Sequence, residues 1–298
     1  MRKKSRSFAA LDIVYIAMMI LPIVAALALK VITTPPSDGV SITGAQIYFT
    51  IPMPLQDLPI TESQVNSWLV MISIVGLCLF LTHGLTTRNV SKRQHLAEWA
   101  VEAVEKLVKN GMGEYFMGFA PFITAVLALS GFSSLLALFG LFAPTSDMNV
   151  VSGWAVLVFI LITYYKMKCG PITYIKNMAD PPLLAPLNII SEVATPISMA
   201  FRHYGNVLSG SVISVLVATA LQGLTKLLLG WLPGFLGDIP FLRIGIPAVL
   251  SIYFDIFSGC LQAYIFAMLT MMYVSGGFPM EEYLARKAKK ERKKKETN

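Results

Sequence analysis

The sequence predicts an all-α integral membrane protein with about six membrane helices, the last two long and steeply tilted, and one amphipathic helix on the inner surface. Three observations support this class. Hydrophobic residues make up 55% of the 298 residues, charged residues only 14%, and the mean hydropathy is +0.64. A soluble domain carries about a quarter charged residues, so this composition excludes a water-soluble globular fold and a disordered chain.

Residues 8–32 form the first apolar run, and four basic residues precede it. A spanning helix needs about 20 mostly apolar residues. A signal peptide is the competing interpretation, because Ala26-Leu27-Ala28 resembles a cleavage site. The run is longer than the roughly 7–15 apolar residues of a signal peptide, which favours a retained span.

Residues 33–64 are rich in Pro, Thr and Ser and contain no Lys or Arg, so we expect them to form a loop outside the cell. The later spans are predicted at residues 66–85, 116–142, 150–165, 186–229 and 240–275. The 44-residue fifth stretch would be about 66 Å long as a helix, whereas the hydrocarbon core is about 30 Å thick. We therefore expect the last two to tilt steeply and to form a hairpin around a turn near 231–238.

The basic residues predict the orientation. Twenty of the 24 lie in four segments on one side of the predicted membrane: the N-terminus, residues 88–109, residues 166–176 and the tail. This asymmetry is the positive-inside signature and predicts that both termini are cytoplasmic. It also means that the net charge of +7 does not indicate nucleic-acid binding. The chain divides into an N-terminal extension (1–44), a membrane domain (45–276) and a basic cytoplasmic tail (277–298).

Residues 91–109 are predicted to form the amphipathic surface helix. One apolar stripe at helical spacing comprises Leu96, Trp99, Ala100, Val104, Leu107 and Val108. Glu102/Lys106 and Glu105/Lys109 have the i,i+4 spacing of ion pairs. Ser91 with Gln94 fits a capping box, and Gly111 fits a helix stop. The alternative is a helix that docks on a soluble partner.

Polar residues inside the predicted membrane are the candidate functional residues, because ionisable groups at that depth cost about 2.5–3.5 kcal/mol each. Arg202 lies 16 residues into the fifth stretch. It belongs to one helical face with Ser191, Thr195, Ser198, Asn206 and Ser209, and Glu192 lies beside that face. The sixth stretch carries Ser251, Asp255, Ser258 and Gln262 on one face. We expect the two polar faces to line a common cavity.

Two structural interpretations compete with a functional one. Arg202 and Asp255 could form a static buried ion pair, and the Ser and Thr hydroxyls could simply bond to their own helix backbone. In the functional interpretation, water or ions move along the polar faces. Arg202 cannot lose its proton and is a fixed barrier to cations, whereas Asp255 can load and release a proton. His203 is interpreted as an interhelical hydrogen bonder rather than a relay.

No nucleotide-binding, metalloprotease or serine-hydrolase motif is present. The three cysteines, Cys78, Cys169 and Cys260, lie far apart in or beside apolar runs and indicate neither disulfides nor a metal site. We therefore predict no cofactor and no enzymatic activity of the chain by itself.

Residues 186–210, PLNIISEVATPISMAFRHYGNVLSG, resemble the signature of subunit a of the F-type ATP synthase membrane sector. The family pattern places Ser-Glu before Pro-x-Ser and then Arg-x-x-Gly-Asn. A second match is LQAYIFAMLTMMYV at 261–274, and the surface helix and the APTSD loop at 143–147 are also similar. The resemblance covers roughly residues 45–276, so the first span lies outside the common core and looks like a variant found in some bacterial members.

The resemblance implies a proton-translocating stator subunit that stands against a ring of c subunits and couples ion flow to rotary ATP synthesis. Its partners would be the c ring, b-type peripheral stalk subunits, the lipid bilayer and, indirectly, the F1 sector, in a bacterial plasma membrane. Arg202 would be the essential arginine, with Gln262 opposite it. Asn206 and Asp255 would line the outer half-channel, and Glu192 and Ser198 the inner one.

Two positions depart from the family. Ser211 stands nine residues after the arginine, where Glu or His is frequent, and Asp255 stands seven before Gln262, where His or Glu is usual. The outer path would then depend on Asp255 and water. Two other functions stay open: a stand-alone secondary transporter or ion channel, which usually has repeated halves that this sequence lacks, and a structural membrane subunit.

Overall fold

The computed structural model describes residues 2–33, 44–54, 56–87, 90–168, 170, 174, 183, 185–229, 245, 249–250, 252–278, 280 and 283–284. Six helices in this part are long and apolar enough to cross a membrane. The prediction of an all-α membrane protein is therefore confirmed. The expected turn near 231–238 and nearly all of the basic tail lie outside the described residues.

The chain begins with α1 (Arg2–Thr33), followed by the hairpin β1 (Ile47–Ile51) and β2 (Leu58–Thr61) and then α2 (Glu62–Thr82). Next come α3 (Lys92–Met112), the 3-10 helix η1 (Glu114–Phe119), α4 (Ala120–Leu138), the 3-10 helix η2 (Pro144–Ser146) and α5 (Met148–Lys168). The last elements are α7 (Ala185–Leu229), the π-helix η3 (Ile252–Ser258) and α10 (Gly259–Gly276).

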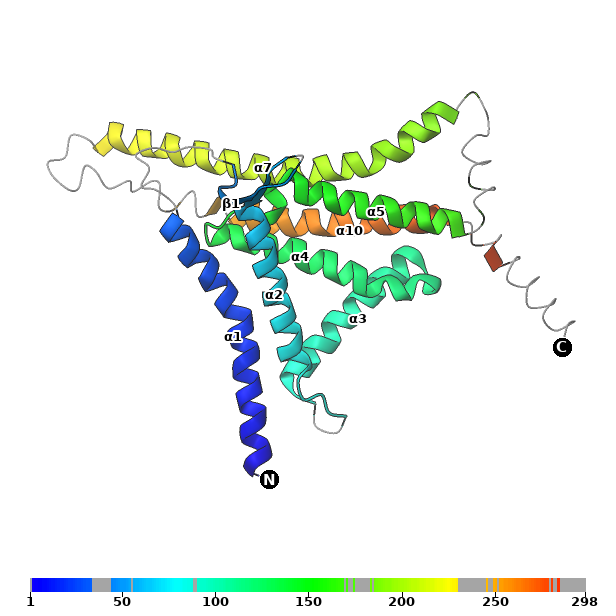
Figure 1. Ribbon diagram of the computed structural model, residues 1–298, viewed down its shortest axis with the longest axis horizontal. Coiled ribbons are helices and arrows are strands. Elements are labelled where there is room, and N and C mark those ends of the chain that lie inside the picture. Colours follow the sequence, from blue (N-terminus) through cyan, green and yellow to red (C-terminus); the bar gives the residue numbers. More distant parts are fainter. Residues whose placement is uncertain are drawn as a thin grey trace, which may run out of the picture.

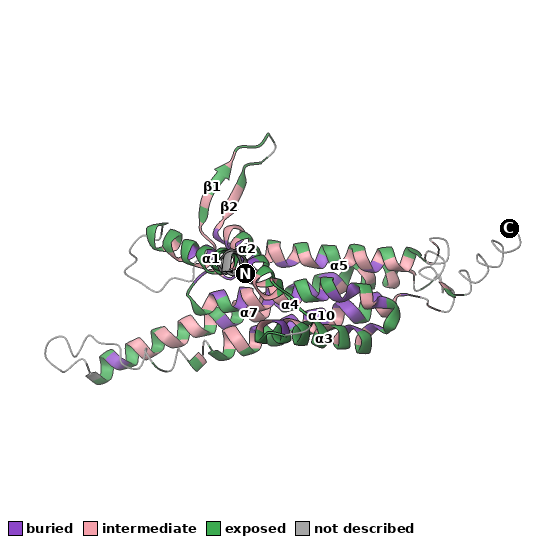
Figure 2. Ribbon diagram, turned by 90° about the horizontal axis from the view of Figure 1, so that it is seen from below, coloured by how far each residue is buried: buried purple, intermediate pink, exposed green. Residues whose placement is uncertain are grey.

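The helices α4, α5, α7 and α10 run alongside one another, and the pair α1 and α2 crosses them steeply (Figure 1). Helices α4 and α5 both run the length of the bundle, from one end to the other. We call these two ends the hairpin end and the α3 end, after the elements that lie there. The hairpin end holds β1–β2, which projects from the bundle (Figure 2), and the loop 140–147. The α3 end holds η1 and the C-termini of α3, α5 and α10.

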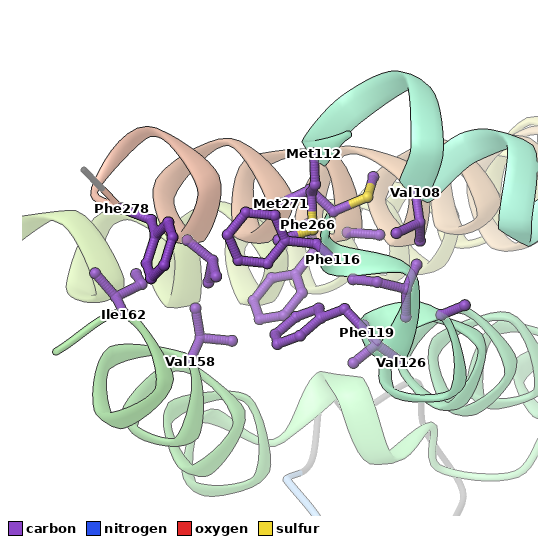
Figure 3. Packing of buried hydrophobic residues seen from close by; sticks show 14 of the residues in the cluster. Val108, Met112, Phe116, Phe119, Val126, Val158, Ile162, Phe266, Met271 and Phe278 are labelled. Carbon is purple, nitrogen blue, oxygen red and sulfur yellow. The ribbon is translucent and has the colours of Figure 1, made fainter. Parts of the chain in front are cut away.

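The main hydrophobic core lies at the α3 end, where α3, η1, α4, α5 and α10 meet (Figure 3). Phe116 packs against Tyr165 and Phe278, with ring centroids 5.6 and 5.4 Å apart. The outward faces are also apolar, and exposed examples include Ile13, Leu21, Ile160, Ile190 and Phe201. Apolar residues outside as well as inside are the pattern expected of a bundle that contacts lipid.

The structure corrects the loop prediction for residues 33–64. Ile47–Ile51 and Leu58–Thr61 form an antiparallel hairpin, in which Ile51 pairs with Leu58 and Ile47 with Thr61. Six of the nine strand residues are Ile, Phe, Tyr or Leu, and β-branched and aromatic residues favour strands. The loop prediction, which rested on the Pro, Thr and Ser content and on the lack of Lys and Arg, therefore missed the hairpin.

The amphipathic helix is confirmed as α3, with two corrections. Ser91 Oγ accepts the Gln94 N–H at 3.3 Å, as a cap should. The helix passes Gly111, which faces Met271 of α10, and ends at Gly113, whose φ of 84° is readily adopted by glycine.

Of the two ion pairs expected on α3, the structure contains one. Glu102 pairs with Lys106 at 2.8 Å, and this hydrogen bond lowers the pKa of Glu102. Lys109 instead pairs with Glu114 of η1 at 2.7 Å. The surface helix is thus joined to the following span by its last turn, which the sequence spacing did not indicate.

Helix α1 lies along α2, and a glycine permits their close approach. A Cβ on Gly76 would lie 2.9 Å from the backbone nitrogen of Met19, so any side chain there forces the helices apart. We expect Gly76→Val to lower the stability of the purified chain in detergent by about 1–3 kcal/mol, measured by thermal unfolding. Gly131→Val on α4 is the matched control, because a Cβ there meets nothing within 4 Å. Equal losses in both variants would contradict the α1–α2 packing.

Candidate functional site

A cleft of ≈ 430 Å³ with a mixed polar and apolar lining opens at the hairpin end. Its wall combines α1, the loop after α4, α7 and η3, and it includes Lys30, Tyr204, Ser211, Ser214 and Asp255. The structure thus brings together Ser211 and Asp255, the two positions where the sequence departs from the family pattern. The hydroxyl of Ser214, which belongs to a residue of the cleft wall, is buried without a hydrogen-bond partner among the described residues.

A second, smaller cleft of ≈ 260 Å³ lies at the α3 end. Lys166 of α5, Glu192 and Thr195 of α7, and Tyr273 of α10 line it. Lys166 Nζ is 2.9 Å from Glu192 Oε1. Burial, reinforced by a hydrogen bond to Glu192, raises the pKa of Tyr174. The predicted Glu192 therefore lies at the opposite end of the bundle from Asp255 and is charge-compensated.

Arg202 lies between the two clefts and lines neither of them. Along α7 it is ten residues from Glu192 and nine from Ser211, which is about 15 and 14 Å. Its side chain is exposed, and within the described part of the chain it forms no hydrogen bond or ion pair. The alternative of a static buried pair with Asp255 is therefore wrong.

The rotation of α7 depends on the neighbouring residue, His203. Its side chain is 1% exposed, and its Nε2 lies 3.4 Å from Ser130 Oγ of α4. The ring also meets Phe266 of α10 edge-on, with centroids 5.7 Å apart, and Trp154 of α5 at 6.0 Å. Successive helix residues are about 100° apart, so burying His203 turns Arg202 outward. The interpretation of His203 as an interhelical hydrogen bonder agrees with this geometry.

Asn206 joins the two polar faces. Its amide donates to Ser258 Oγ at 2.7 Å, which ties α7 to η3. One helix turn later, Gln262 is buried on α10, with 5% exposed. Asp255 lies in the π-helical turns of η3, a backbone form that is rare and often found at functional sites. Asn206 and Ser258, one from each predicted polar face, are thus in contact. Of the described residues expected to line a common cavity, only Asp255 lines the hairpin-end cleft.

Two hydroxyls of the predicted stripe follow the structural interpretation, since Thr195 and Ser209 donate to backbone carbonyls of α7 at 2.9 and 3.1 Å. Ser211, outside that stripe, does the same at 2.8 Å. Ser198 is exposed and lines neither of the two clefts. Helical periodicity placed these residues on one face but did not distinguish the hydroxyls that reach across, such as Ser258, from those that do not.

Sequence reasoning missed Lys166 and Lys30 as site residues. Both were counted only as charges in the topology argument, and Lys30 was one of the four basic residues outside the inner segments. The one available signal was that a lysine at the outer end of a predicted span has no place in a positive-inside distribution. Their carboxylate partners, Glu192 and Glu62, are far away in sequence and were not predictable.

Fold and site together define a multi-pass, all-α membrane protein with a cleft that contains charged residues at each end. On the long helix between them, Arg202 has no ion-pair partner among the described residues. The family model described as ATP synthase A chain matches residues 64–275, and the chain belongs to this family.

Among curated relatives, the "ATP synthase subunit a" of Legionella pneumophila (strain Philadelphia 1) is 28% identical over 76% of this chain and 90% of the relative. The protein of that name from Priestia megaterium is 33% identical over 74% and 94%. The "ATP synthase subunit a 1" of Crocosphaera subtropica is 28% identical over 73% and 87%.

The Asn206–Ser258 hydrogen bond gives a structural prediction. We expect Asn206→Ala to cost about 1–2 kcal/mol, the range of interhelical hydrogen bonds in membranes, and to increase hydrogen exchange in η3. Thermal unfolding and amide exchange in detergent measure the two effects. Ser209→Ala is the control, since that hydroxyl is exposed and bonds only to its own helix. The tie is refuted if exchange in η3 is the same in both variants.

Proposed function

We propose that the chain is the proton-translocating stator subunit of an F-type ATP synthase, with the two clefts as half-channels and Arg202 as the barrier between them. The observation that carries the proposal is the position of Arg202: exposed, unpaired among the described residues, and set between polar clefts at opposite ends of α7. An unpaired guanidinium at membrane depth is costly. This cost supports the proposal that Arg202 pairs with an acidic residue on another chain.

In this proposal the hairpin-end cleft is the outer half-channel. A proton enters past Ser211 and is held by Asp255, which can bind and release it. Asn206 keeps η3 against α7 through Ser258 and so keeps Asp255 on the cleft wall. From Asp255 the proton passes through water to a carboxylate carried by a c subunit that faces α7. Gln262, one turn beyond Ser258, provides a polar group on the same path.

Arg202 acts on that carboxylate as it passes. A nearby positive charge favours the ionised form of an acid, so the c-subunit carboxylate releases its proton on approaching Arg202. Because the guanidinium stays charged, it also prevents protons from crossing directly between the clefts. The ring must therefore rotate to carry each proton from one half-channel to the other.

The α3-end cleft is the inner half-channel. Glu192 and Ser198 lie on α7 between Arg202 and this end of the bundle. The released proton leaves past them. Lys166 pairs with Glu192, so the carboxylate remains at the cleft without the full cost of a lone buried charge. The positive-inside distribution supports this end, and both termini, on the cytoplasmic side of a bacterial plasma membrane.

The energetics require a counting device. One charge that crosses 100 mV releases about 2.3 kcal/mol, far less than the synthesis of one ATP needs, so several protons must be used per ATP. A c ring that passes a fixed arginine performs this count. Nucleotide chemistry would belong to the F1 sector, and b-type stalk subunits would hold this chain still. The membrane domain at 45–276 would carry the function, flanked by the extension at 1–44 and the tail at 277–298.

We predict that Arg202→Ala reduces proton-driven ATP synthesis in membrane vesicles by at least about a hundredfold, while the complex still assembles. Arg202→Lys should also fail or leak, because a desolvated lysine can deprotonate. Lys226→Ala, an exposed cation near the end of the same helix, is the control and should remain coupled. Normal synthesis in Arg202→Ala would refute the proposed function.

For Asp255→Asn we predict that proton entry becomes rate-limiting and that synthesis slows about tenfold or more, since an amide cannot relay a proton. The dependence of the rate on the pH outside should change as well, because a titratable group has left the path. The measurement is ATP synthesis at fixed internal pH and varied external pH. An unchanged profile would remove Asp255 from the path.

Reconstitution separates this function from the two alternatives. A secondary transporter moves solute when it is the only protein in the liposome, whereas half of a channel does not. A purely structural subunit would leave proton flux intact in the Arg202→Ala complex. Ion or solute flux through the purified chain alone would favour the transporter or channel.

A further inference from the structure

Helix α1 precedes the residues that the family model matches, 64–275, yet it is tied to the bundle at both ends. Where α2 ends and α3 begins, the Asp12 carboxylate lies 2.9 Å from His83 Nδ1 and 3.0 Å from Arg93 Nη1. At the hairpin end, Lys30 Nζ lies 3.5 Å from Glu62 Oε1 and donates to the Gly140 carbonyl. These contacts define the position of α1 along α2 more closely than apolar packing alone.

The hairpin-end contact is part of the functional cleft. Lys30 lines the same cleft as Ser211 and Asp255. Its partner Glu62 is nearly buried, with a side chain 5% exposed, and accepts the Phe142 N–H at 3.3 Å. The Phe142 carbonyl accepts from Asn66 at 2.8 Å. Lys30 and α2 therefore hold residues 140–142, and these residues form part of the cleft wall.

We propose that Lys30 is a positioning residue of the outer half-channel: α1 supplies a fixed cation to the cleft wall, and this cation holds the Glu62 carboxylate and the 140–142 segment in place. The role rests on the proposed function, in which this cleft admits protons. A buried carboxylate without a partner is strongly destabilising, so loss of the ammonium would leave Glu62 uncompensated and would release the wall that it supports.

The other charged and titratable groups near this contact are few within the described residues. Asp255 faces the cleft from η3, and Asp147 accepts a hydrogen bond from Ser63, next to Glu62. Burial, and then the nearby Glu62 charge, raises the pKa of Tyr48 on β1. Among the described residues near this contact, Lys30 is thus a cation surrounded by the carboxylates of Glu62, Asp147 and Asp255, and its removal makes the local charge more negative.

The first test measures the charge that the cleft presents, independently of proton coupling. In the assembled complex, Cys78, Cys169 and Cys260 are replaced by serine, and Ser211→Cys adds one thiol to the cleft. An anionic sulfonatoethyl and a cationic trimethylammonioethyl methanethiosulfonate then label it. We expect Lys30→Met to lower the ratio of anionic to cationic labelling rates about threefold or more and Lys30→Arg to preserve it. A ratio unchanged by Lys30→Met overturns the proposal, because loss of packing alone would alter both rates alike.

The second test measures proton-driven ATP synthesis in complexes that keep Ser211 and the native cysteines and carry only the single substitution. We expect Lys30→Met to slow synthesis about fivefold, and Lys30→Arg to restore most of the rate. Asp12→Asn is the matched control, since it breaks the other tie of α1 and leaves the cleft intact, so its rate should stay near that of the wild type. Equal losses in Lys30→Met and Asp12→Asn would show that α1 is only an anchor and would overturn the proposal.

The two tests also separate this inference from the proposed function. A wild-type complex that makes no ATP from a proton gradient refutes the proposed function. The labelling ratio would still show whether Lys30 contributes positive charge to the cleft wall. Coupled synthesis in the wild type, with no effect of Lys30→Met on either measurement, refutes the role of Lys30 alone.

Discussion

The burial of His203 among three helices is the interaction on which the site depends. A 45-residue helix with apolar residues on most faces has no strong preference for its rotation in a lipid-like environment. His203 removes that freedom, because its ring fits between Ser130, Trp154 and Phe266. Since adjacent residues project about 100° apart, one buried side chain is enough to present Arg202 on the open side of α7. The guanidinium then lies on the exposed side of α7, without an ion-pair partner among the described residues.

Close contacts between helices shape the hairpin-end cleft. A Cβ on Gly210 would lie 3.1 Å from Phe254 Cβ, and one on Gly259 would lie 2.6 Å from Ser134 Cβ. These glycines let η3 and α10 approach α7 and α4, which brings Asp255 to the cleft wall. Small residues serve the same purpose in other membrane bundles, where lipid gives helices no hydrophobic reason to associate.

Charge compensation follows one pattern at both ends of the bundle. Each cleft contains a lysine from a neighbouring helix, Lys166 at one end and Lys30 at the other, and each lysine pairs with a glutamate. Such pairs let carboxylates remain at polar clefts within a largely apolar protein. Arg202 lies between them along α7 and differs from both lysines, because it has no ion-pair partner among the described residues.

Composition and periodicity predicted the class of protein, the positions of the spans and the amphipathic helix. They could do so because a membrane helix requires a local run of apolar residues, and a surface helix requires local helical spacing of its apolar residues. The polar stripe on α7 and the family resemblance were likewise visible in the residues. Tertiary structure alone decided the β1–β2 hairpin, the capping by Gly113, the outward rotation of Arg202, and the pairing of Glu192 and Glu62 with lysines from other helices. Spacing tells which face of a helix a residue occupies, but which helix packs against that face, and with what charge, depends on the packing of the whole chain.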